Sequence, residues 1–221
     1  MSLVDSPPFI SGSLTDIASA DKHFERFPHY EAVLGWITDF VLAPDPRLAR
    51  PGAVCPRLAS SIDRNQVWLV TISTTSATVV ESVQTAWILA DLFGELFTTD
   101  DDFRRGTLLA VFPDLDPASA AAFIDDGHAR IRSDFVRRGL MLGEFHPASS
   151  VGSVHNPAFP VMQSPVPMFA VRALTSHDIL FLDRPGPHRQ RLLGWWLDHV
   201  AGRASAAAVD HVQRTLTAMG R

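Results

Sequence analysis

Hydrophobic residues recur at two spacings along this chain, and the alternation of these spacings predicts its secondary structure. An apolar face at the helical spacing of three and four residues occurs in residues 29–43, 76–97, 117–138, 188–200 and 205–219. Short apolar or β-branched runs, which are typical of strands, occupy residues 66–73, 107–112, 140–145 and 168–174. Strands that alternate with helices of this length need crossover connections, so we expect an α/β fold, with α+β as the alternative.

The sheet predicted by this pattern is small, mixed and partly parallel. Residues 107–112, TLLAVF, form a nearly continuous apolar run, which is typical of a strand buried on both faces. A loop rather than a helix precedes residues 168–174, which allows that strand to run antiparallel. The two final helices should form a C-terminal helical hairpin that is broken near Gly202.

The helix over residues 117–138 has the clearest ends. Asp116 is a candidate N-cap, Pro117 occupies the first helical position, and Gly139 follows the last one. This order of residues is typical of a helix with defined start and stop signals. Residues 1–22 carry no comparable pattern, so we expect an N-terminal arm followed by a single globular domain over residues 23–221.

Composition favours a soluble, cytoplasmic protein. A chain of 221 residues with 46% hydrophobic and 19% charged residues can bury a core. A net charge of −5 with scattered basic residues argues against a nucleic-acid groove. No run approaches the ~20 apolar residues of a membrane span, and the start MSLVDSPPFISG lacks the apolar core of a signal peptide. We therefore expect a small-molecule substrate as partner, and neither nucleic acid nor membrane.

A proline-rich loop, residues 146–167, separates the last two predicted strands. It reads HPASSVGSVHNPAFPVMQSPVP and contains two histidines. An unstructured connection of this length is uncommon in a compact domain unless it is functional or disordered. Val151, Phe159 and Met162 provide apolar anchors, and the prolines lower the entropy cost of ordering. The loop should therefore be ordered and lie over a pocket.

His146 follows the strand predicted over residues 140–145, where a scaffold can present a side chain to a pocket. Glu144 shares its face because side chains alternate along a strand. With His155, these residues could supply the two imidazoles and one carboxylate of a non-haem Fe(II) site. Alternatively, Glu144 and His146 hold the loop backbone by hydrogen bonds, and His155 only begins the turn HNP.

Three further residues are candidates for chemistry. His128 lies on an apolar helix stripe and is either a core residue or a pocket residue oriented by Asp125 or Arg132. Cys55 is an inert thiol, a nucleophile or a thiolate ligand to haem iron. Arg172, inside a predicted strand, pairs with an acid such as Glu144, holds a carboxylate or propionate in a cavity, or faces solvent.

Several segments together resemble a known family. RPGAVCP, TLLAVFP, GLMLGEFHP, HNPAFP and SPVPMFAVRAL occur in this order, and the chain resembles, over about residues 28–185, an uncharacterised bacterial domain of unknown function. GEFHP and SPVPM are the specific part of this resemblance. The order of motifs is also distantly similar to the YqcI/YcgG family, which includes haem-dependent N-hydroxylases of natural-product pathways.

In the YqcI/YcgG resemblance, Cys55 and Pro56 match the family's Pro-Cys turn, and His146 and Pro147 match its His-Pro pair. The chain departs from that family after His-Pro, where SSVGSVHNP replaces an arginine-rich segment and no arginine occurs until Arg172.

The resemblance implies a haem-dependent oxygenase that acts on a small amino-acid-like or amine substrate. His146 would be the axial metal ligand, with Cys55 as the competing candidate, and Arg172 would contact the haem. His155, Arg172 and His128 would line the pocket, while the protein sets the polarity and access of the iron. The alternative is a non-enzymatic protein that binds a small ligand or a partner, with the loop shaping its surface.

Overall fold

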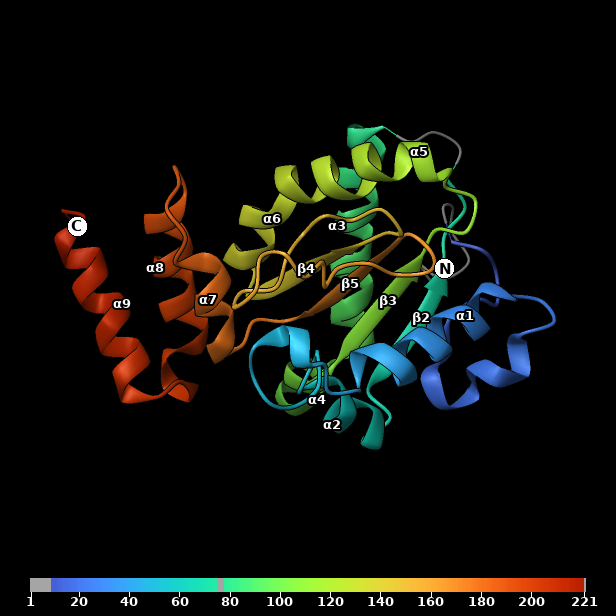
Figure 1. The fold of residues 1–221 in the computed structure, drawn as a ribbon, viewed down its shortest axis with the longest axis horizontal. Coiled ribbons are helices and arrows are strands. Elements are labelled where there is room, and N and C mark those ends of the chain that lie inside the picture. Colours follow the sequence, from blue (N-terminus) through green and yellow to red (C-terminus); the bar gives the residue numbers. More distant parts are fainter. Residues whose placement is uncertain (1–8, 75–77, 221) are drawn as a thin grey trace.

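A single mixed sheet forms the centre of the protein (Figure 1). The computed structural model describes residues 9–74 and 78–220, and within these ranges the sheet has five strands in the order β1-β2-β3-β5-β4. The strands are β1 (Thr15–Asp16), β2 (Val67–Thr71), β3 (Thr107–Val111), β4 (Leu140–Phe145) and β5 (Met168–Ala173). Strands β2 and β3 are parallel, whereas β5 is antiparallel to both β3 and β4. The expected α/β class, the partly parallel sheet and the antiparallel last strand are confirmed.

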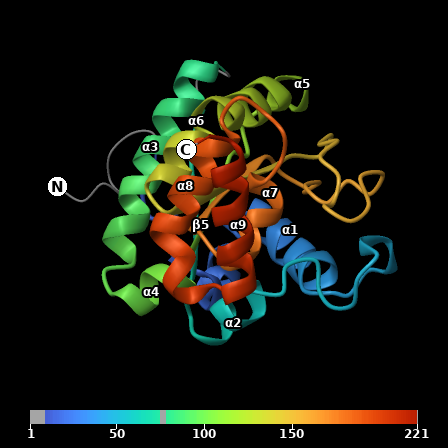
Figure 2. The same ribbon diagram turned by 90° about the vertical axis from the view of Figure 1, so that its left-hand side faces the viewer.

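Helices cover both faces of the sheet. One face packs against α3 (Val79–Leu96) and against a continuous helical segment made of α5 (Pro117–Ala120), a π-helical turn (Ala121–Asp126) and α6 (Gly127–Arg137). The other face packs against α1 (His29–Trp36), a π-helical turn (Ile37–Val41) and α2 (Leu58–Asp63). Figure 2 shows α3 and α1 on opposite sides of the sheet, with residues 146–167 on the α1 side.

The side chains of β4 alternate between these two faces. Leu140 and Leu142 belong to the core under α3 and α6, whereas Phe145 belongs to the core under α1. In β5, Phe169 lies on the α6 face and Ala170 on the α1 face. This alternation decides which candidate residues can meet, because the sheet separates its two faces.

The C-terminal helices form a layer of their own. After a short 3-10 helix (Ser176–Asp178), α7 (Ile179–Leu182) leads into α8 (Arg189–Val200), a 3-10 turn (Ala201–Arg203) and α9 (Ala206–Ala218). Helices α8 and α9 bury Trp196 and Val212 in a third core that also contains Val136 of α6. The expected C-terminal hairpin is confirmed.

Helix boundaries mostly follow the sequence signals, with one correction. The third predicted helix begins at Pro117, and Gly139 follows its end with a φ of 74°, the left-handed conformation that glycine adopts easily. The side chain of Asp116 makes no capping hydrogen bond. The Ser119 backbone N–H donates instead to the Asp116 carbonyl oxygen at 2.9 Å, so Asp116 is the N-cap as expected, but it caps the helix through its backbone and not its side chain.

The N-terminal segment contributes to the sheet where the structure describes it. Residues 1–8 of the expected arm lie outside the described ranges. The described part of the expected arm begins at Phe9 and contains β1, which pairs antiparallel with β2. The Ser13 hydroxyl also donates to the Thr71 carbonyl at 3.2 Å. This segment is therefore one edge of the sheet. No helix in residues 9–74 and 78–220 is long and apolar enough to cross a membrane.

Candidate functional site

Two histidines and two carboxylates meet where β4 ends beneath α6. We call Asp125, His128, Glu144 and His146 the histidine–carboxylate cluster. Glu144 points to the α6 face of β4, like Leu142 before it, and His146 follows the strand directly. Asp125 and His128 are three residues apart on one helical segment, so they share a side of it. Packing of this segment over the sheet brings the four residues together.

The cluster consists of two imidazole–carboxyl pairs. His128 Nδ1 lies 3.0 Å from Glu144 Oε2, and His146 Nε2 lies 3.0 Å from Asp125 Oδ2. The pairs are close enough for the charge of Asp125 to act on Glu144. The structure therefore brings three of the sequence-predicted residues together, His128, Glu144 and His146, and adds Asp125 to them.

Burial favours the neutral forms of both His128 and Glu144. The two side chains are only 12% and 14% exposed. Loss of solvation raises the pKa of Glu144 to about 7 and lowers the pKa of His128 to about 4. Near neutral pH Glu144 therefore titrates beside a His128 ring that stays unprotonated. A carboxyl group that titrates near neutrality is suited to general acid–base work.

His146 is fixed through one ring nitrogen and open at the other. Its side chain is 2% exposed, and Nε2 donates to the carboxylate of Asp125. Within the described part of the chain, buried Nδ1 has no hydrogen-bond partner, and neither has Asp125 Oδ1. An ionised carboxylate accepts only, so it keeps the proton on Nε2 and leaves a lone pair on Nδ1. Nδ1 is thus available as a base or as a metal ligand.

Positive charge and solvent both reach the cluster. Asp125 is 37% exposed, whereas its imidazole partner is 2% exposed. Arg132 and Arg184 act electrostatically on Glu144. The Arg132 guanidinium donates to the Phe181 carbonyl oxygen at 2.7 Å, which holds it beside the cluster. This positive charge favours a ligand with an anionic group.

Arg172 and Cys55 lie on the opposite face of the sheet from the cluster. Arg172 alternates with Ala170, and Cys55 packs in the same core as Ala170. Arg172 forms a two-point ion pair with Asp178, at 2.6 and 2.8 Å. Of the three alternatives for Arg172, pairing with an acid is confirmed, but the acid is Asp178 and not Glu144, because the side chains of Arg172 and Glu144 leave the sheet in opposite directions.

Asp178 also accepts from the Thr175 backbone in a capping box. The sequence signal for this role is the spacing of Thr175 and Asp178, three residues apart before an apolar run.

Cys55 is a partly buried free thiol. Its backbone N–H donates to the Val41 carbonyl oxygen at 3.0 Å, and Arg57 and Arg172 are its charged neighbours.

His155 is exposed on the proline-rich loop. The next residue, Asn156, accepts from the Ala158 backbone and donates to the Arg47 carbonyl oxygen at 2.8 Å, which anchors the turn. In the described ranges no group of three or more His, Cys, Asp or Glu residues is arranged to hold a metal ion. Glu144, His146 and His155 are therefore not assembled as a three-ligand Fe(II) site.

The proline-rich loop is ordered and borders a cleft. Val161 N–H donates to the Val151 carbonyl at 3.0 Å, and Ser153 N–H donates to the Phe159 carbonyl at 2.9 Å. Between the loop and α1 is an open cleft of about 670 Å³, whose lining includes Trp36, Phe40, Arg47, Phe159 and Pro165. No member of the histidine–carboxylate cluster lines this cleft, because the side chain of His146 turns to the other face of the sheet.

The fold and the cluster together define a mixed α/β protein with a buried histidine–carboxylate site. The model of the domain of unknown function DUF6875 matches residues 30–211, so the chain belongs to this family. The expected membership of a family of unknown function is thus confirmed. No curated protein and no solved structure matches the chain.

Proposed function

We propose that this protein is an enzyme that abstracts a proton from a small carboxylate substrate at the histidine–carboxylate cluster. The observation that carries the proposal is His146, whose Nε2 is held by Asp125 while its buried Nδ1 has no partner among the described residues. A buried polar atom left without a hydrogen bond costs ~1–3 kcal/mol. An unpartnered buried polar atom calls for an explanation, and a hydrogen bond to a bound substrate would supply one.

His146 and Glu144 have complementary roles in this mechanism. His146 accepts the substrate proton at Nδ1, and Asp125 stabilises the resulting imidazolium as carboxylates do in catalytic triads. Glu144, whose pKa is about 7, supplies a proton to the product, and the imidazole of His128 lies 3.0 Å from the Glu144 carboxyl. Arg132 and Arg184 attract the substrate carboxylate. After product release, His146 gives its proton to solvent and Glu144 takes one from solvent, which restores both groups for the next turnover.

Exchange of substrate hydrogen with deuterium tests this activity directly. A panel of amino acids and 2-oxo acids is incubated with the protein in D₂O and followed by proton NMR. We expect wild type to exchange the hydrogen next to the carboxylate of at least one compound, and His146→Gln to lose this exchange. His155→Gln is the matched control, because His155 is an exposed histidine on the loop. Equal exchange by wild type and His146→Gln would remove His146 from the mechanism.

A haem-dependent oxygenase acting on an amino-acid-like or amine substrate is the second candidate. The resemblance to the YqcI/YcgG family suggests it, and His146 supports it, because an imidazole oriented by a carboxylate through one nitrogen is a common arrangement for a metal ligand. Haem would supply the oxygen-activating chemistry. Arg172 is poorly suited to contact the haem in this second candidate, because its guanidinium is already paired with Asp178.

An absorption spectrum separates the two candidates. If haem binds through His146, haem added to wild type and to Cys55→Ser gives a Soret band of a ligated iron, and His146→Ala does not. Loss of the band in Cys55→Ser alone would assign the iron to the thiolate. If wild type takes up no haem specifically but catalyses deuterium exchange, the oxygenase is excluded and the acid–base enzyme is supported. Ligand binding confined to the loop cleft would instead support a non-enzymatic binding protein.

A further inference from the structure

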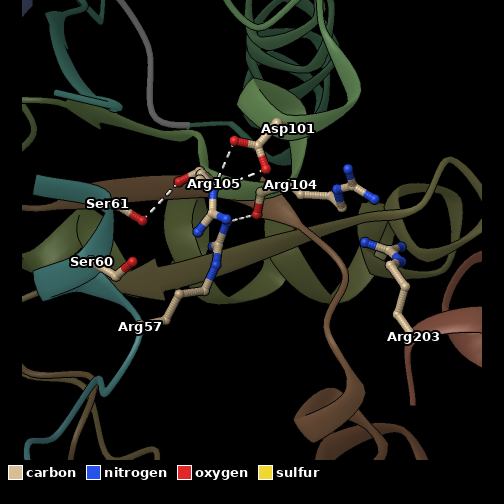
Figure 3. Close-up of a pocket in the computed structure, with 7 residues that line it drawn as sticks. All are labelled: Arg57, Ser60, Ser61, Asp101, Arg104, Arg105 and Arg203. Atoms are coloured by element: carbon tan, nitrogen blue, oxygen red, sulfur yellow. Dashed lines mark hydrogen bonds and ion pairs between the residues drawn. The ribbon is translucent and has the colours of Figure 1, made fainter. Parts of the chain in front are cut away.

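A second cleft, rich in arginine, lies where three distant parts of the chain meet (Figure 3). Its volume is about 420 Å³, and its lining residues are Arg57, Ser60, Ser61, Asp101, Arg104, Arg105 and Arg203. They come from α2 and the residue before it, from α4 (Asp100–Arg105), and from the turn between α8 and α9. We call this the arginine cleft. It is separate from the histidine–carboxylate cluster, none of whose residues lines it.

Two of the four arginines have structural partners within the cleft. Arg105 forms an ion pair with Asp101 at 3.0 Å. Arg57 donates to the backbone carbonyls of Arg104 and Gly106, which braces the end of α4. Ser61 completes this wall by donating to the Arg105 carbonyl at 2.7 Å. The side of the cleft formed by α2 and α4 is therefore built and rigid.

The other two arginines, Arg104 and Arg203, form no ion pair within the described part of the chain, although the charge of Arg104 acts on Asp101. The guanidinium groups of Arg104 and Arg203 point toward one another in Figure 3. Arg203 donates only to the His199 backbone carbonyl, and neither arginine forms an ion pair with any residue that the structure describes. Like charges that face each other across a cleft repel, and an anion between them would turn this repulsion into attraction. Arg57 lines the same cleft and adds positive charge, whereas Asp101 balances the charge of Arg105.

We propose that the arginine cleft binds the phosphate group of a small phosphorylated molecule, with Arg104 and Arg203 as the paired cationic ligands. The planar guanidinium fork matches the oxygen geometry of phosphate. The hydroxyl of Ser60 lines the same cleft and can add a neutral hydrogen bond. Since the cleft is larger than a phosphate ion, it has room for part of the esterified group. A polyanion such as nucleic acid fits less well, because the net charge of the chain is −5.

Binding of phosphate would tie the C-terminal hairpin to the body of the protein. Arg203 belongs to the turn between α8 and α9, whereas Arg104 belongs to α4 beside the sheet. An anion held by both arginines bridges these two parts, so it should raise the melting temperature and slow amide exchange in the turn around Arg203. This stabilisation is a readout that requires no enzymatic assay.

Titration calorimetry with phenyl phosphate and inorganic phosphate tests the site. We expect both probes to bind wild type and to bind Arg104→Gln and Arg203→Gln at least about tenfold more weakly, as loss of a charge-assisted hydrogen bond implies. Arg130→Gln is the matched control, because Arg130 is an exposed arginine outside the cleft. Tighter binding of phenyl phosphate would identify a phosphomonoester as the ligand, and tighter binding of inorganic phosphate would identify the free ion.

The charge state of the ligand gives an independent control. A phosphomonoester becomes a dianion above about pH 6, so binding of phenyl phosphate should strengthen between about pH 5 and about pH 7.5, whereas binding of sulfate should not change in parallel. The proposal is overturned if neither phosphate probe binds at millimolar concentration. It is also overturned if Arg104→Gln and Arg203→Gln, shown to be folded by circular dichroism, bind phenyl phosphate as tightly as Arg130→Gln does.

Discussion

Glu144 links burial in this protein to a measurable dependence on pH. Its pKa in the folded protein is about 7, above the ordinary value of 4.5, because the carboxyl is shielded from solvent. The folded state therefore holds a proton that the unfolded state has released between these two pH values. Protonated Glu144 stabilises the fold at low pH, and this contribution is lost as the pH rises through about 7.

Replacement of Glu144 by Gln should remove this pH dependence. The introduced amide would stay neutral at every pH, so the stability of Glu144→Gln relative to wild type should increase by up to ~3 kcal/mol between about pH 4.5 and pH 7. Urea unfolding of both proteins at several pH values measures the difference. Glu25→Gln, at an exposed glutamate, should show no such trend. A constant difference between Glu144→Gln and wild type across this range would contradict the raised pKa.

Replacement of His128 by an apolar residue should destabilise the fold, because the Glu144 carboxyl would then be buried without its polar neighbour. His128→Leu takes away the imidazole that lies 3.0 Å from the Glu144 carboxyl, so we expect a loss of ~1–3 kcal/mol in the free energy of unfolding. The double variant His128→Leu/Glu144→Leu should recover part of that loss, because neither polar group remains buried alone. A double-mutant cycle from denaturant unfolding measures the coupling. Additive effects of the two substitutions would show that the His128–Glu144 contact contributes nothing.

The sequence identified members of the cluster but not how they pair. The position of His146 at a strand end and the shared face of Glu144 follow from alternation along one strand, which is local information. The pairing of His128 with Glu144 depends on the position of α6 along β4. Tertiary packing sets this position, and a local sequence pattern does not. Asp125 illustrates this point, because helical spacing suggested it as a partner of His128, whereas it binds His146.

At the scale of whole elements, hydrophobic periodicity predicted the long helices and the four longer strands. These elements are long enough for a local pattern to be significant. Strand β1 has two residues and no pattern of its own, so its pairing with β2 could not be predicted. The face of the sheet that Arg172 occupies likewise requires the register of β5, in which Arg172 lies opposite Met141 of β4.

The proline-rich loop depends on one close backbone approach. Gly152 bridges to Pro160, and a Cβ atom at Gly152 would clash with the backbone of Pro157. Gly152→Ala should therefore displace the loop wall of the cleft and speed hydrogen exchange at the Ser153 and Val161 amides, whose bonds close the loop. Hydrogen exchange measured by NMR tests this effect.

Gly186→Ala is the control for this loop prediction, since nothing lies within 4 Å of a Cβ built at Gly186. Unchanged protection of both loop amides in Gly152→Ala would contradict the proposed packing.

At the scale of the whole molecule, the sheet divides the candidate residues into two groups. His146 and its partners lie on the α6 face, and Cys55 and Arg172 lie on the α1 face. A single ligand cannot contact both groups without crossing the sheet. Cys55→Ser should therefore leave deuterium exchange at the cluster unchanged, whereas Asp125→Asn should reduce it strongly by removing the charge that stabilises protonated His146.

The comparison of Cys55→Ser with Asp125→Asn tests which face of the sheet carries the reaction. Both variants are assayed in D₂O with the compound that wild type exchanges. Their melting temperatures are first compared with that of wild type, to show that both variants are folded. If Cys55→Ser abolished exchange while Asp125→Asn retained it, the reacting atoms would belong on the α1 face. Retention of deuterium exchange in Cys55→Ser and its loss in Asp125→Asn would assign the chemistry to the α6 face. On this face Glu144 and His146, at the end of β4, lie against the helical segment that carries Asp125 and His128.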